Sequence, residues 1–105
     1  MNSKFLSMLG LCRRAGAVII GTDLVTKSLP SGKVKLVIYA ENASQNTEKK
    51  ITDKCKFYGV TCVKAQESTD EIAHAIGKLS SVGVVGITDE NFSKELVIRI
   101  SNETR

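Results

Sequence analysis

Short runs of consecutive apolar residues alternate along this chain with segments whose apolar residues recur at helical spacing. The clearest run, VKLVIYA at 34–40, is too uniformly apolar for a strand with one face in water, and it predicts a strand buried on both faces. Because strand-like and helix-like segments alternate, we expect an α/β fold. Its central sheet should be largely parallel or mixed, with helices on both faces.

The same periodicities place the individual elements. Strands are expected at 17–20, 34–40, 60–64 and 82–88. Helices are expected from Phe5 to the Ala15–Gly16 turn, at 22–29, 44–58 and 68–76, and after Asp89, which can cap the last one. The apolar stripe of helix 44–58 runs as far as Tyr58, which is therefore predicted to pack in the core.

Size and composition fit one compact domain. A chain of 105 residues with 42% hydrophobic residues can bury a core without disulfides or a structural metal, and no linker or repeat divides it. We expect a single domain over residues 1–105. No apolar run approaches the roughly 18 residues of a membrane-spanning helix, so we expect a soluble, cytoplasmic protein with no membrane partner.

The sequence lacks the motifs of an enzyme or a metalloprotein. It contains no glycine loop for dinucleotides or phosphates, no nucleophile elbow and no metalloprotease motif. The three cysteines form no C-x-x-C pair, and His74, the only histidine, is predicted on the solvent side of its helix. We expect no catalytic residue, no metal site and no cofactor.

The sequence also argues against two kinds of RNA-binding surface. G-V-V-G at 83–86 matches the G-x-x-G string of KH domains, but its valines lie in a predicted strand and not in an exposed loop. The five aromatic residues, several on predicted core stripes, leave no row of rings for stacking single-stranded bases. If RNA is bound, we expect it to be structured.

Positive charge is concentrated in the first half of the chain. Residues 1–56 hold ten Lys or Arg against four Asp or Glu, whereas residues 57–105 hold five against seven. A basic surface on a small domain favours an anionic partner, most commonly nucleic acid, although a merely solvated basic face fits the charge equally well. The candidate phosphate contacts are Arg13, Arg14, Lys33 and Lys35.

The segment G-T-D-L-V-T-K at 21–27 carries the candidate site. Gly21 permits close approach of a partner, and a helix that starts at Thr22 or Asp23 presents N–H groups that suit phosphate. Lys27, one turn after Asp23, can reach a phosphate or a guanine edge, and the Asp23 carboxylate can accept hydrogen bonds from base amino groups. The plain alternative is that Thr22 or Asp23 caps the helix and Lys27 is solvated.

A second helix start should lie at the same edge of the sheet. The strand at 34–40 is followed by Glu41-Asn42-Ala43-Ser44, where the next predicted helix begins. Ligands of alternating strand–helix folds gather at such an edge, so we expect the two helix starts to act together.

Four blocks of the sequence resemble a known family. They are G-T-D-L-V-T-K at 21–27, K-L-V-I-Y-A-E-N-A-S at 35–44, D-K-C-K-F-Y-G-V at 53–60 and A-I-G-K at 75–78. In order and spacing they are similar to the kink-turn RNA-binding ribosomal-protein family of L7Ae and L30e, with the bacterial YlxQ-like branch as the nearest fit, over roughly residues 5–90. The resemblance implies a three-layer α/β/α sandwich with a central four-stranded mixed sheet.

The resemblance also implies which residues contact RNA. In the family a G-x-N-E-x-x-K segment opens the second helix and reads the tandem sheared G·A pairs of a kink-turn. Gly21 and Lys27 match this segment, whereas Asp23 stands at its Asn position and Leu24 at its Glu position. Further contacts are implied at the acidic turn after the second strand, Glu41, Asn42 and Ala43, and at the place of a Ser-Lys-x-x-Leu-Gly loop, Ser68, Ile72 and Ala73.

The resulting hypothesis is a non-enzymatic, monomeric RNA-binding protein of ribosomal type. Its expected partner is structured, kink-turn-like RNA such as rRNA, and through it the ribosome, with no DNA partner. The rival is a protein–protein interaction module on the same fold, serving the ribosome or the RNA-processing machinery, with Leu24 and Ile72 as its apolar patch. RNA binding should weaken steeply as salt rises, whereas binding to such a protein partner should change little.

Overall fold

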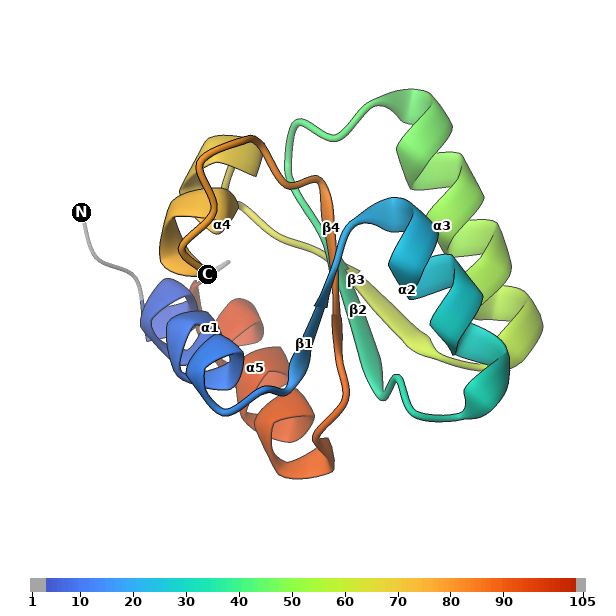
Figure 1. Ribbon diagram of the computed structural model, residues 1–105, viewed down its shortest axis with the longest axis horizontal. Coiled ribbons are helices and arrows are strands. Elements are labelled where there is room, and N and C mark those ends of the chain that lie inside the picture. The colour runs from blue at the N-terminus through green and yellow to red at the C-terminus, as the bar shows by residue number, and fades with distance from the viewer. Residues whose placement is uncertain (1–3, 104–105) are drawn as a thin grey trace.

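The computed structural model describes residues 4–103, which form three layers around a central sheet (Figure 1). The helices are α1 (Lys4–Arg14), α2 (Thr22–Ser28), α3 (Gln45–Tyr58), α4 (Thr69–Ala75) and α5 (Glu90–Glu103), with a 3₁₀ turn, η1 (Leu29–Ser31), after α2. The strands are β1 (Val18–Ile20), β2 (Leu36–Tyr39), β3 (Thr61–Lys64) and β4 (Val84–Ile87). Helices α2 and α3 cover one face, and α1, α4 and α5 cover the other. The predicted three-layer α/β/α sandwich is confirmed.

The sheet is mixed, with the strand order β1-β4-β2-β3. Strand β4 is antiparallel to β1 and to β2, whereas β2 and β3 are parallel. It follows that β1, β2 and β3 all run in one direction. The chain therefore leaves these three strands at the same edge of the sheet, which decides where the candidate site lies.

Side chains of the central strand β4 point alternately into two separate cores. Val85 packs with α1, α4 and α5, whereas Val84 packs with α2 and α3. Gly86 lies on the α2 side, where an added Cβ would be 3.3 Å from the side chains of both Val25 and Val34. The missing side chain lets α2 lie close to the sheet. The G-V-V-G string at 83–86 thus belongs to strand packing, as predicted.

Helix boundaries follow the predicted signals. Ser68 and Glu71 form the capping box that begins α4, with each side chain accepting a hydrogen bond from the other residue's main-chain N–H. Asp89 caps α5 by accepting a hydrogen bond from the Phe92 amide at 2.9 Å. Gly59, with φ of 70°, ends α3. The strands are one or two residues shorter at their ends than predicted, because the apolar runs continue past the last paired residues.

The prediction that Tyr58 packs in the core is wrong. Tyr58 is 38% exposed, and the neighbouring Phe57 is 79% exposed. The Val60 N–H donates to the Cys55 carbonyl, so the chain already turns back toward the sheet beneath the last turn of α3. Cys55 and Val60 make apolar contacts on this side of the sheet, and the rings of Phe57 and Tyr58 stay at the surface.

No helix within the described range is both long and apolar enough to cross a bilayer.

Candidate nucleic-acid interface

Three strands end at one edge of the sheet, and a helix begins after each of them. The starts of α2, α3 and α4 therefore gather on the upper side of the molecule in Figure 1. Three main-chain hydrogen bonds tie these connections together: Gly21 N–H to Val84 O (2.9 Å), Ala40 N–H to Gly83 O (2.9 Å) and Glu41 N–H to Glu67 O (2.8 Å). We call this surface the strand-end edge and define it as residues 21–24, 41–44, 66–69 and 77–83.

Gly21 forms the turn into α2. Its φ of 100° lies in the region that favours glycine, and it occupies the N-cap position, so the first turn of α2 has no side-chain cap. Thr22 and Asp23 lie inside the helix, which means that neither acts as the cap. A Cβ on Gly21 would have no neighbour within 4 Å. The positive end of α2 is therefore open to an approaching anion.

Asp23 has a partner that the sequence did not predict. Its carboxylate lies 3.6 Å from the Nζ of Lys50, which projects from the second turn of α3. The Asp23 side chain is 88% exposed, so the pair adds little to stability and remains accessible to a ligand. Lys50 was missed because only the packing of α2 against α3 brings the two residues together. Nothing in their spacing of 27 positions signals the contact.

The other two members of the segment, Leu24 and Lys27, are both exposed on α2. The Leu24 side chain is 58% exposed and follows Asp23 in the first turn of α2. Lys27 lies in the last turn of α2, one turn beyond Asp23, as the spacing predicted. Together with Lys50, the segment 21–27 thus offers one carboxylate, two ammonium groups and one apolar side chain.

Asn42 fixes the turn after β2 to the start of α4. The Thr69 N–H donates to Asn42 Oδ1 at 2.8 Å, and Asn42 Nδ2 lies 3.5 Å from Thr69 Oγ1 as a donor. Because its amide is engaged on both sides, Asn42 holds the turn in shape, and the Glu41 carboxylate beside it is exposed. Ala43 is half-buried against the α3 core.

Three predicted contacts around α4 turn out to have structural roles. Ser68 lies at the strand-end edge, where its hydroxyl caps α4. Ile72 and Ala73 are buried in the core with α1 and α5, because they occupy the inner face of α4. Their side chains are not available to RNA, so we remove both from the candidate interface. The apolar patch of the rival hypothesis loses Ile72 for the same reason.

The predicted phosphate contacts at Arg13, Arg14, Lys33 and Lys35 do not lie at the strand-end edge. Lys35 directly precedes β2, and its N–H donates to the Ile87 carbonyl at the last residue of β4. Arg13 and Arg14 end α1 and precede β1, at the same opposite edge. Charge counts along the sequence could not reveal this, because residues close in sequence lie at opposite ends of strands.

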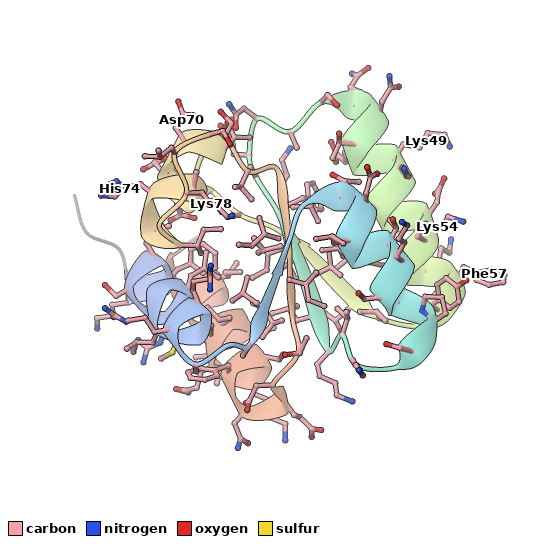
Figure 2. All side chains as sticks on the ribbon, viewed as in Figure 1. Lys49, Lys54, Phe57, Asp70, His74 and Lys78 are labelled. Atoms are coloured by element: carbon pink, nitrogen blue, oxygen red, sulfur yellow. The ribbon has the colours of Figure 1, made fainter. Side chains whose placement is uncertain are left out.

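A loop that the predicted contacts did not include completes the strand-end edge. Residues 77–83 run from α4 to β4, and Gly83 accepts the hydrogen bond from Ala40 described above. The loop is held to α4 by Ser81 Oγ, which donates to Asp70 Oδ1 at 2.8 Å. Lys78, labelled in Figure 2, and Leu79 are both exposed on this loop, and Leu79 is fully exposed. The sequence signal that could have identified this exposed loop is Leu79, an apolar residue that lies between Gly77 and Gly83.

Two of the three cysteine thiols are held in the protonated form. Burial, followed by the charge of Asp89, raises the pKa of the Cys12 thiol to about 11. A hydrogen bond with Cys55, together with burial, also raises the pKa of the Cys62 thiol. Both thiols are therefore protonated and unreactive near neutral pH. Among the described residues no group of His, Cys, Asp or Glu side chains is gathered to hold a metal ion.

Comparison with known proteins assigns the family. The family model described as "Ribosomal protein L7Ae/L30e/S12e/Gadd45 family" matches residues 3–97. The chain belongs to this family. Over 94 residues it is 43% identical to the RNA-binding protein YlxQ of Bacillus subtilis, covering 90% of this chain and 92% of that protein. It is 34% identical over 96 residues to the large ribosomal subunit protein eL30 of Sulfolobus acidocaldarius, covering 91% and 92%.

Solved structures of the L7Ae/L30e fold agree with the architecture. A protein of unknown function from Bacillus halodurans C superposes with a TM-score of 0.89 at 37% identity, over 95% of this chain and 99% of that one. A 15.5kD RNA binding protein of Giardia lamblia superposes with a TM-score of 0.77 at 21% identity, over 97% and 92%. The similarity to the Giardia lamblia protein is evidence for the fold alone.

Proposed function

We propose that this protein is a non-enzymatic RNA-binding protein of ribosomal type that binds kink-turn-like RNA at the strand-end edge. Membership of the L7Ae/L30e family and the RNA-binding and ribosomal names of its relatives support the class of partner. Ribosomal RNA is the candidate ligand and the cytoplasm its place of action. In this assignment the protein acts as a monomer, since one chain carries the whole edge.

The observation that carries the proposal is the convergence of the helix starts and the loop 77–83 at one edge. The uncapped start of α2 suits a phosphate, and Lys27 and Lys50 supply charge beside it. Asp23 and Glu41 supply acceptors for base amino groups, which phosphate contacts alone would not need. Carboxylates that lie beside lysines favour an RNA whose base edges can be reached, as they can in the open grooves around sheared G·A pairs.

Substitution of Lys27 tests the site. Lys27→Ala should weaken binding of a kinked RNA by about 1–3 kcal/mol if the ammonium reads a base edge, and should mainly reduce the salt slope if it touches a phosphate. Fluorescence anisotropy at two salt concentrations separates the two roles. Lys94→Ala, which removes an exposed charge from α5 on the opposite face, is the matched control and should leave affinity nearly unchanged. Equal effects of the two substitutions would refute the site.

The exposed Leu24 favours one competing function, the docking of a protein partner at the same edge. RNA binding predicts an affinity that falls steeply as salt rises, and Leu24→Ala would then change it little. A protein partner predicts an affinity that changes little with salt and falls clearly in the Leu24→Ala variant. The salt titration above therefore also separates these two functions.

A further inference from the structure

The exposed aromatic pair at the end of α3 is not explained by the strand-end edge. Phe57 is 79% exposed, and its ring meets that of Tyr58 edge-to-face, with the ring centroids 4.9 Å apart. Edge-to-face packing favours this arrangement of the two rings. Single exposed apolar side chains are common, but these two adjoining rings form a patch, and an exposed apolar patch is a candidate contact for a partner.

Helical spacing puts Phe57 on the same face of α3 as two lysines. Lys50, Lys54 and Phe57 are separated by four and three residues, so their side chains project from one stripe of α3. Figure 2 shows Lys54 and Phe57 on this helix. The Lys50–Asp23 ion pair at 3.6 Å shows that this stripe faces α2. It begins at the strand-end edge and runs roughly 18 Å along α3 from the helix start to Phe57.

Lys27 borders the same stripe from the side of α2. Both helices run away from the strand-end edge, and Lys27 lies one turn beyond Asp23, as Lys54 lies one turn beyond Lys50. Within residues 4–103 neither Lys27 nor Lys54 forms an ion pair, and the nearby Asp53 is engaged by Lys49 at 3.3 Å. We call Lys27, Lys50, Lys54 and Phe57 the α2–α3 face.

We propose that the α2–α3 face binds a single-stranded RNA segment that continues from the RNA held at the strand-end edge. Lys54, which lies further along this face than the strand-end edge, contacts its phosphates, and one unpaired base stacks on Phe57. Single-stranded RNA is bound by positive side chains that contact successive phosphates and by aromatic rings on which any base can stack. Within the described residues, the α2–α3 face has lysines without ion-pair partners next to an exposed ring. This inference rests on the proposed function, because the segment needs the edge as its starting point.

The test uses three labelled RNAs and fluorescence anisotropy. One is a blunt kinked hairpin, and the others carry about eight unpaired nucleotides at the 5′ or the 3′ end, a length within known single-strand site sizes. For the natural protein, one tailed RNA should bind roughly 5- to 100-fold more tightly than the blunt hairpin. Phe57→Ala should remove most of this gain and Lys54→Gln part of it. Both variants should bind the blunt hairpin as the natural protein does.

The controls are Ile98→Ala and Lys94→Gln, which change an exposed apolar side chain and an exposed lysine of α5 on the opposite face. Both should keep the full gain from the tail. If the blunt hairpin binds but neither tail adds affinity, or if Phe57→Ala weakens all three RNAs equally, the α2–α3 face is not an RNA site and its ring serves a different partner. If no hairpin binds at all, the proposed function fails first and this inference with it.

Discussion

At the scale of the single residue, Asp23 departs from the family pattern, and the structure shows which residue it contacts. A carboxylate stands where the family segment has an amide, and its partner is Lys50 on α3. An aspartate keeps the acceptors of asparagine and loses its donor. The sequence predicted that Asp23 would be presented at a helix start, and it is. The ion pair could not be predicted, because it depends on how α2 leans on α3.

Restoring the amide should strengthen binding of a kinked RNA. Asp23→Asn supplies the missing donor and frees Lys50, so we expect affinity to rise by about 1 kcal/mol or more. Anisotropy with the blunt hairpin measures the change. Asp53→Asn is the matched control, since it removes the same charge from a similarly exposed ion pair with Lys49. If Asp53→Asn raises affinity as much, the gain is due to net charge and not to the amide donor.

Cys12 gives a prediction about pH. Its folded-state pKa is raised from 9.0 to about 11, so between these values the unfolded chain loses a proton that the folded protein keeps. The stabilisation is complete below pH 9 and is lost as pH rises toward 11. Between about pH 8 and pH 10.5, the free energy of unfolding in urea should fall by roughly 2 kcal/mol more for the natural protein than for Cys12→Ala. Equal falls would contradict the buried, protonated thiol.

At the scale of the element, apolar periodicity and capping signals were enough to predict each helix and strand. Ser68 with Glu71 and Asp89 are local signals, and they begin α4 and α5 as expected. Tyr58 was misplaced because periodicity predicts which side of a helix is apolar and not where along the helix its packing in the core ends.

The close packing of α2 on β4 predicts that Gly86 does not tolerate a side chain. An added Cβ would lie 3.3 Å from two valine side chains, so Gly86→Ala should lower the free energy of unfolding by about 1–3 kcal/mol. Gly83→Ala is the control within the same segment, because nothing lies within 4 Å of its added Cβ, and should change stability by less than about 0.5 kcal/mol. Urea unfolding of both variants checks the difference, and a tolerant Gly86 would mean that α2 packs more loosely.

At the scale of the whole molecule, strand direction separates residues that are close in sequence. Gly21 lies at one edge of the sheet and Lys35 at the opposite edge, although only 14 positions separate them in the sequence. Asp23 and Lys50 are 27 positions apart and form an ion pair. The sequence could predict that the starts of α2 and α3 share an edge, since both follow parallel strands. It could not predict that β4 runs the opposite way, and so it missed the loop 77–83 at the same edge.

Amide chemical-shift mapping of the isotope-labelled protein with the blunt kinked hairpin tests the central claim most directly. We predict that the largest changes fall at residues 21–24, 41–44 and 77–83, that Lys27 and Lys50 follow, and that Arg13, Arg14, Lys33 and Lys35 at the opposite edge change little. If the changes instead centre on that opposite edge, or are absent while the hairpin is bound, the strand-end edge is not the RNA interface.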